Sequence, residues 1–299
     1  MDHPYRLISL FVAGIVTVII GFFSLRCNSL LISVYSSSQH RQNSTALFLC
    51  ALGCSDFCLT FTIMFLGGLV NWRHEGIFQP LLNVYGLGYP LVVQLCLVLG
   101  TTSIYFCIAA AVNCLRSAPC TPKRAKEVVI VITCLSFVLM IPQFMSVDIL
   151  RCLSDYSLAP SFTPCLNLHL RSSFKFIVYQ AYILIPLRVI LPLLLLIILG
   201  FCLIVTQLRK RHRGRQPVPT TDDNFEQFEI ETISSVNSAQ DYTTSVIAIV
   251  VVFMIWFSIE LFVHFALYQV LDYSYQDDIL QFVKVCHCAF NLYIYCRIP

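Results

Sequence analysis

Long runs of apolar residues, separated by short polar segments, dominate the chain. Each run approaches the roughly 20 residues that an α-helix needs to cross the hydrocarbon core of a bilayer. Backbone polar groups in hydrocarbon must be hydrogen-bonded within their own segment, and no series of short alternating strands is present, so we expect helices. The pattern predicts seven transmembrane spans, at residues 7–35, 45–70, 81–112, 128–147, 174–206, 244–271 and 279–296.

Composition supports an all-α integral membrane protein. Of the 299 residues, 58% are hydrophobic and 12% are charged, against about 45–50% and about 25% in soluble domains. A water-soluble core cannot absorb this excess, so the lipid bilayer is the expected surrounding. We therefore expect one seven-helix domain over residues 1–299 and no binding to nucleic acid.

The basic residues indicate the orientation of the spans, because Lys and Arg are concentrated in cytoplasmic loops. They follow the first, third and fifth spans, which predicts an extracellular N-terminus, a cytoplasmic C-terminus and a multi-pass protein of the plasma membrane. The longest polar stretch, residues 209–242, is predicted to be a flexible third cytoplasmic loop. The basic residues concerned are Arg41, Arg116, Lys123, Arg124, Lys126, Arg209, Lys210, Arg211, Arg213 and Arg215.

The informative charged side chains inside the spans are Asp56, Arg188, Glu260 and Lys284. Charges within a membrane are costly and usually mark function. Polar and aromatic residues recur at helical spacing around Glu260 and Lys284. This spacing predicts one polar face that runs from the extracellular side toward the centre of the bundle. These residues are Phe253, Trp256, Glu260 and His264 on the sixth span, and Lys284, His287, Asn291 and Tyr295 on the seventh.

Short motifs occur in a fixed order along the spans. They are Asn28 in the first span, Leu-x-x-Ser-Asp ending at Asp56, Pro192, and Asn291-Leu292-Tyr293-Ile294-Tyr295. In this order they resemble the rhodopsin-like (class A) G-protein-coupled receptors. A narrower resemblance, to the invertebrate FMRFamide-peptide receptors, lies in Tyr89-Pro90, Ser103-Ile104-Tyr105, Ile141-Pro142-Gln143-Phe144, Val250-Val251-Val252-Phe253, and Asn291 to Tyr295 followed by Cys296.

The resemblance implies a central sodium and water pocket. Its residues here are Asp56, Ser103 and Asn291, completed by Asn28 and His287. The alternative is a hydrogen-bonded polar cluster without an ion. Apart from this structural sodium ion, no cofactor is expected.

The resemblance also implies a short extracellular peptide as ligand. The expected contacts are Glu260, His264, Lys284, Tyr179, Tyr182 and Phe257. Since peptides of the resembling family end in Arg-Phe-amide, Glu260 is a candidate for binding a cationic ligand group. An internal pair with Lys284 or with Arg188 accounts for the same charges, and the aromatic residues are alternatively packing or interface anchors. The sequence leaves these alternatives open.

The chain departs from the family at its cytoplasmic end. Asn113-Cys114-Leu115 stands where the family has an acidic-Arg-Tyr signature. The resemblance still implies a heterotrimeric G protein, with arrestin as a further partner, but the missing arginine favours weak or absent coupling. The residues expected to face the G protein are Asn113, Cys114, Arg116, Arg209, Arg211 and Tyr295.

The third span has no cysteine at its outer start, so Cys152 and Cys165, in a polar extracellular segment, are expected to form a disulfide.

No pattern of covalent catalysis is present, and we do not expect an enzyme. The alternatives to a signalling peptide receptor are a chemosensory or decoy receptor that does not couple, and a transporter or channel that uses the intramembrane charges, although no inverted halves are present.

Overall fold

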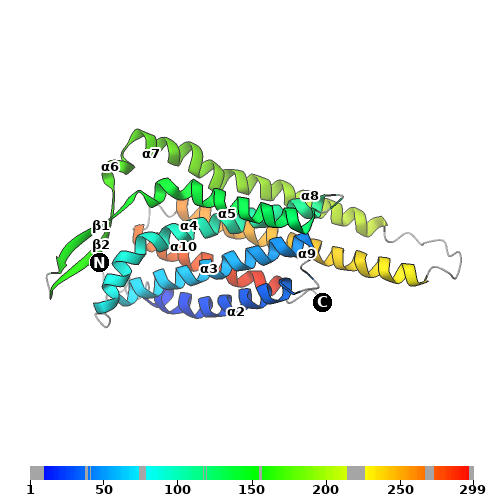
Figure 1. Cartoon of the computed structure of the whole chain (residues 1–299), viewed down its shortest axis with the longest axis horizontal. Coiled ribbons are helices and arrows are strands. Elements are labelled where there is room, and N and C mark those ends of the chain that lie inside the picture. The colour runs from blue at the N-terminus through cyan, green and yellow to red at the C-terminus, as the bar shows by residue number, and fades with distance from the viewer. Residues whose placement is uncertain are drawn as a thin grey trace.

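The computed structural model describes residues 10–37, 40, 42–73, 79–116, 118, 120–154, 157–213, 226–266 and 273–295, and the side chains of part of these. The chain forms a seven-helix membrane bundle (Figure 1). Six helices are long and apolar enough to span a membrane, and the seventh has a shorter apolar part, Ile279–Phe290.

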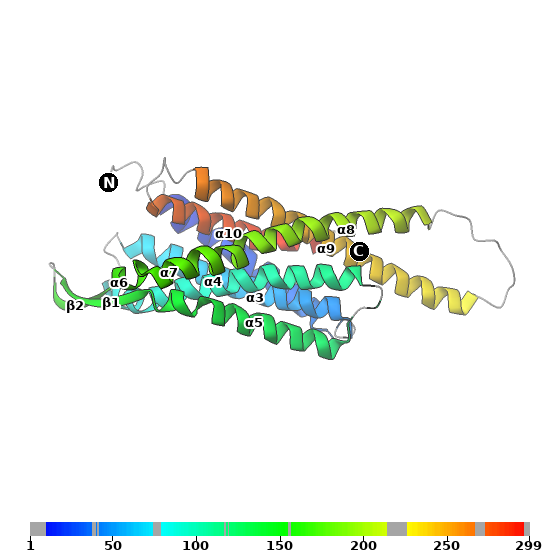
Figure 2. The ribbon, with the colours of Figure 1, turned by 90° about the horizontal axis from the view of Figure 1, so that it is seen from above.

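The bundle is built from successive antiparallel helices, visible in two views (Figures 1 and 2). The fifth span is a composite of four segments. In chain order the helices are η1 (Leu10–Val16) with α2 (Thr17–Tyr35), α3 (Ser44–Arg73), α4 (Gln79–Leu115), α5 (Pro122–Phe144), the short α6 (Leu168–Arg171), then α7 (Phe174–Val178), η2 (Tyr179–Leu184), η3 (Pro186–Ile190) and α8 (Leu191–Arg213), followed by α9 (Glu226–Ala266) and α10 (Tyr273–Tyr295).

The outer surface of the bundle is apolar. Large hydrophobic side chains such as Phe22, Phe61 and Ile198 are exposed. In water this arrangement would be unfavourable, whereas lipid tails are as apolar as these side chains. The exposed surface therefore fits the bilayer predicted from the composition.

The interior carries the polar groups, and they bond from helix to helix. Ser24 on α2 lies 3.0 Å from Thr60 on α3, hydroxyl oxygen to hydroxyl oxygen. Ser55 on α3 donates a 2.9 Å hydrogen bond to the carbonyl of Leu99 on α4. Such bonds contribute about 0.6 kcal/mol each on average in membrane proteins. These bonds hold α2, α3 and α4 together.

Close packing of α2 on α3 depends on a small residue. A Cβ atom at Gly21 would lie 2.5 Å from Cγ of Met64, closer than two carbon atoms can approach. Glycine at this point allows the two helices to pack at this distance.

The helix ends differ from the predicted boundaries. We expected the fourth span to begin at residue 128 because charged residues precede it, but α5 begins at Pro122. Thr121 caps this helix, since its side chain accepts a hydrogen bond from the backbone N–H of Arg124, and proline is favoured in the first turn. The sixth helix also begins earlier, at Glu226 instead of 244, in a stretch without glycine or proline. Both α8 and α9 thus extend into the predicted loop 209–242.

A β-hairpin outside the bundle was not predicted. Strand β1 (Val147–Ser154) pairs antiparallel with β2 (Ser157–Leu166). The hairpin lies at one end of the bundle, and the extensions of α8 and α9 project from the opposite end (Figure 1). Pro160 and Pro164 in β2 argued against a strand in the sequence, because within sheets proline is confined mainly to edge strands, strand starts and bulges.

Candidate functional site

A cavity of about 290 Å³ lies among the helices of the second, third, fifth, sixth and seventh spans. Its walls are mostly apolar, but all four of the intramembrane ionisable residues predicted from the sequence line it. These are Asp56, Arg188, Glu260 and Lys284. The cavity is close to the lower end of the roughly 300–1,000 Å³ typical of ligand pockets.

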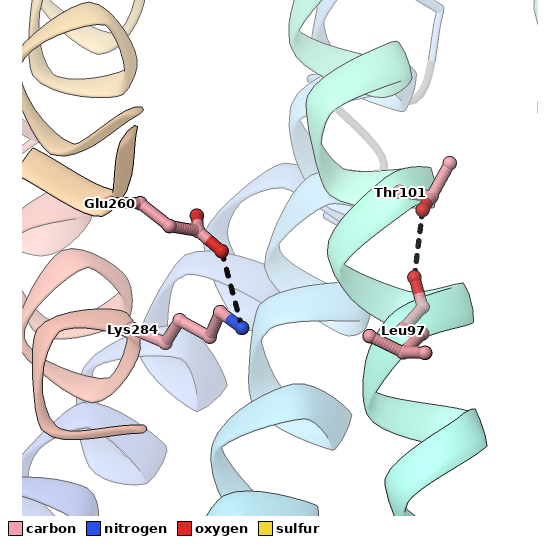
Figure 3. A network of polar contacts seen from close by, with 4 residues as sticks. All are labelled: Leu97, Thr101, Glu260 and Lys284. Carbon is pink, nitrogen blue, oxygen red and sulfur yellow. Dashed lines mark hydrogen bonds and ion pairs between the residues drawn. The ribbon is translucent and has the colours of Figure 1, made fainter. Parts of the chain in front are cut away.

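Glu260 on α9 and Lys284 on α10 form an ion pair in this cavity. The Nζ atom of Lys284 lies 3.3 Å from Oε1 of Glu260, and the side chains are 32% exposed for Glu260 and 29% for Lys284. Figure 3 shows both reaching into the space between α9, α10 and α4. Of the partners that the sequence left open for Glu260, the structure selects Lys284.

Arg188 enters the same cavity from the fifth span. Within the part of the chain that the structure describes, no carboxylate lies within 4.0 Å of its guanidinium, and Glu260–Lys284 is the one ion pair. An unpaired charge near the middle of a membrane helix costs about 2.5–3.5 kcal/mol. Glu260 interacts with this charge electrostatically and, with the other polar groups that line the cavity, limits the cost.

The backbone around Arg188 is irregular for an identifiable reason. In η3 the N–H of Leu191 bonds to the carbonyl of Pro186, five residues earlier. The next residue, Pro192, has no N–H, so the carbonyl of Leu187 lacks the equivalent partner. The hydroxyl of Tyr105 on α4 replaces it with a 2.6 Å hydrogen bond. The third span thus holds the segment that carries Arg188.

Asp56 lies at the inner end of the cavity with Ser103. The Ser103 hydroxyl donates a 2.7 Å hydrogen bond to Oδ1 of Asp56, and both residues are buried. Carboxylate and hydroxyl oxygens are suitable ligands for a hard cation, so the two residues fit the sodium site implied by the resemblance. Of the other three residues of that set, the structure describes the side chains of Asn28 and His287.

The side-chain amide of Asn28 is directed to backbone carbonyls instead of to Asp56. Its amide nitrogen donates to the carbonyls of Ser24 at 3.0 Å and Cys288 at 3.2 Å, and so joins α2 to α10. His287 lines the cavity and packs edge-on against Phe253, with ring centroids 4.2 Å apart. The side chain of Asn291 lies outside the described residues.

Gly100 gives the cavity part of its volume. It lines the cavity, and no heavy atom lies within 4 Å of the position that a Cβ would occupy. A Cβ atom here would therefore enter open space. No pattern in the sequence indicated this residue, since a glycine within an apolar helix is usually a packing position.

The predicted aromatic contacts lie at three different places. Phe257 lines the cavity. Tyr179 instead donates a 2.5 Å hydrogen bond to the carbonyl of Leu139 on α5, and Tyr182 is 77% exposed on the outer surface. Both tyrosines lie in η2, where the α-helical period does not hold, and neither lines the cavity. The side chain of His264 lies outside the described residues.

At the other end of α4, Asn113 is directed inward. Its amide nitrogen donates hydrogen bonds of 2.9 Å to Ser44 and 2.8 Å to Thr45, at the start of α3. Its carbonyl oxygen accepts a 3.0 Å bond from the backbone N–H of Cys120 in the following loop. Asn113 is therefore a buried connection between α3, α4 and this loop, and the sequence did not predict this contact.

The other residues expected to face a G protein differ in accessibility. Arg116 and Arg209 are exposed, and the Cys114 thiol lies 4.0 Å from the Thr45 hydroxyl. The side chains of Arg211 and Tyr295 lie outside the described residues.

The hairpin does not bring Cys152 and Cys165 together. Cys152 is opposite Ser161, and Cys165 is opposite Asp148. The two cysteines are therefore four ladder positions apart, about 13 Å along the strands, whereas a disulfide needs Cα atoms within about 7 Å. A bond between them requires a change of this register. Their side chains are outside the described residues.

Comparison with known proteins supplies one match. The family model described as 7 transmembrane receptor (rhodopsin family) matches residues 27–295. This match spans most of the bundle, from the first helix to the end of α10. No curated protein matches the chain at a significant level.

Proposed function

We propose that this chain, which belongs to the rhodopsin family of 7 transmembrane receptors, responds to a short extracellular peptide at the plasma membrane. The observation that carries the proposal is the cavity with an ion pair between two helices, Glu260 on α9 and Lys284 on α10. A cavity of about 290 Å³ accommodates only the end of a peptide, and the remainder would contact the outer loops.

The ion pair suggests how a ligand would act. A charged ligand group that pairs with Glu260 or Lys284 separates the two partners and removes a direct contact between α9 and α10. Because a ligand shifts a conformational equilibrium only by its difference in affinity for the two states, this exchange is a means of favouring a second helix packing. The FMRFamide-like ligand expected from the sequence would supply an arginine side chain for Glu260.

A G protein is the proposed cytoplasmic partner, with weak coupling. The family arginine is replaced by Cys114, and Asn113 makes three hydrogen bonds within the protein. This second observation favours one alternative, a receptor that binds its ligand without activating a G protein.

The proposal is tested by screening a library of short peptides, amidated and with free carboxyl ends, on cells expressing the chain. Binding and second-messenger output are recorded separately. We expect binding to depend on the ion pair, so that Glu260→Gln weakens it, whereas Glu127→Gln, an exposed carboxylate at the start of α5, leaves it unchanged. Absence of any peptide that binds would reject a peptide ligand. Binding without output would select the non-coupling alternative.

A further inference from the structure

Near the Glu260–Lys284 ion pair, the positive and negative side chains that line the cavity are unequal in number. Two cations, Arg188 and Lys284, and one carboxylate, Glu260, line it there. Lys284 is neutralised by Glu260 at 3.3 Å. Asp56 lies deeper and accepts a hydrogen bond from Ser103. Glu260 also attracts Arg188 electrostatically, but it is shared with Lys284, and among the residues that the structure describes no carboxylate lies within 4.0 Å of the Arg188 guanidinium.

The backbone at Arg188 is held in place, because the carbonyl preceding it is anchored. Tyr105 bonds to Leu187 O at 2.6 Å, immediately before Arg188 in the chain. A side chain on a fixed backbone segment loses less conformational freedom on binding a ligand than one on a mobile segment. Its planar arrangement of five N–H donors matches a carboxylate in a bidentate geometry. A neutral amide accepts such bonds more weakly and brings no compensating charge.

We infer that the ligand presents a carboxylate to Arg188. This inference rests on the proposal that the cavity admits a ligand, and it specifies which chemical group enters. The apolar and aromatic lining of the cavity includes Leu97, Ile104, Val189 and Trp256, so the group next to the carboxylate is apolar or aromatic. A peptide ending in a hydrophobic residue with a free carboxyl group has this chemistry, and so does a small aryl or alkyl acid.

The inference separates two classes of peptide. An amidated C-terminus leaves Arg188 unpaired, whereas a free C-terminus neutralises it. The structure therefore favours free-acid peptides over the amidated peptides that the resemblance suggests, while Glu260 remains able to bind a cationic side chain of the same ligand.

The test uses the full chain purified in detergent and two probes of nearly equal shape, phenylacetate and phenylacetamide. We expect phenylacetate to raise the melting temperature and phenylacetamide to have little effect. In Arg188→Gln the acid concentration for a half-maximal shift rises at least about tenfold, as for loss of a charged hydrogen bond. Arg188→Lys, which keeps the charge but loses the bidentate geometry, gives an intermediate value. Arg124→Gln, an exposed arginine on α5, behaves as the parent.

Equal shifts with both probes, no shift with phenylacetate, or an unchanged shift in Arg188→Gln would each overturn the inference. The peptide screen then identifies the source of the carboxylate and distinguishes this inference from the proposed function. Free-acid peptides that lose potency in Arg188→Gln support a peptide C-terminus. Amidated peptides that act fully on Arg188→Gln overturn the inference and leave the peptide receptor intact. Stabilisation by phenylacetate with no active peptide supports a small acid and rejects the peptide.

Discussion

The hydroxyl of Tyr105 donates a 2.6 Å hydrogen bond to the main-chain carbonyl of Leu187, which ties α4 to the π-helical part of the fifth span. Because Pro192 cannot supply the backbone partner, this side chain replaces a bond that the helix itself cannot form. The contact therefore links Pro192 to the position of Arg188, the cation that directly follows Leu187.

Removing this hydrogen bond should lower stability measurably. Tyr105→Phe keeps the ring but leaves the Leu187 carbonyl without its partner, and we expect a loss of about 0.6–1.7 kcal/mol, the range found for hydrogen bonds between membrane helices. Thermal unfolding of the purified protein measures the change. Tyr182→Phe removes the same atom from a residue that is 77% exposed and serves as the control. Equal melting temperatures for the two variants would show that the Tyr105 contact does not stabilise the fifth span.

The Glu260–Lys284 pair should behave as a coupled unit. Glu260→Gln or Lys284→Met alone leaves one charge without its partner, and we expect each to destabilise the protein by about 1–3 kcal/mol. The double variant removes both charges and should recover much of the loss. A double-mutant cycle on thermal unfolding gives the coupling directly. Strictly additive losses would mean that the two residues stabilise the protein independently.

A sodium ion at Asp56 is a third expectation. With Asp56 and Ser103 as oxygen ligands, sodium chloride should raise the melting temperature of the parent more than an equal concentration of choline chloride does. Asp56→Asn should abolish the difference, because the amide does not carry the charge that holds the cation. Ser103→Ala should reduce it. An identical response of the parent to both salts would favour the alternative from the sequence, a polar cluster without an ion.

The sequence predicted the spans and much of the polar face, and it failed where the helix period changes. Apolar runs identify membrane helices because length and composition alone determine insertion. Helical spacing correctly placed Phe253, Trp256 and Glu260 along one cavity, since α9 is a regular helix there. Tyr179 and Tyr182 were misplaced because η2 has i→i−5 bonds and rotates its side chains away from the α-helical positions.

The ion-pair partner of Glu260 could not be predicted from the sequence, for a different reason. Glu260 had two cations within plausible reach, and only the relative rotation of three helices makes Lys284 the one at 3.3 Å. The inward direction of Asn113 depends in the same way on the start of α3, which is distant in the chain. Such contacts are set by tertiary packing, which no local pattern records.

Restoring the family signature should increase coupling. Asn113→Asp with Cys114→Arg supplies the guanidinium that the parent lacks, and the hydroxyls of Ser44 and Thr45 can rotate to donate to the new carboxylate, so the buried connection at α3 is retained. We expect stronger ligand-evoked G-protein activation than in the parent at matched surface expression. Strong activation by the parent, unimproved by the double substitution, would show that another cytoplasmic surface makes the contact.

The central claim, that an extracellular ligand acts from the cavity, is tested most directly at Gly100. Gly100 lines the cavity, a Cβ atom there has no heavy atom within 4 Å, and replacing glycine within a helix favours folding by up to about 1 kcal/mol, so Gly100→Leu adds a side chain to the cavity. The measurement is the concentration–response curve of the active peptides on cells expressing the parent or Gly100→Leu, at matched surface expression and with melting temperatures confirmed. We expect Gly100→Leu to have an unchanged or higher melting temperature, with the response lost or its potency lowered at least about tenfold. An unaltered curve in a folded Gly100→Leu receptor would contradict it and would place the ligand outside this cavity.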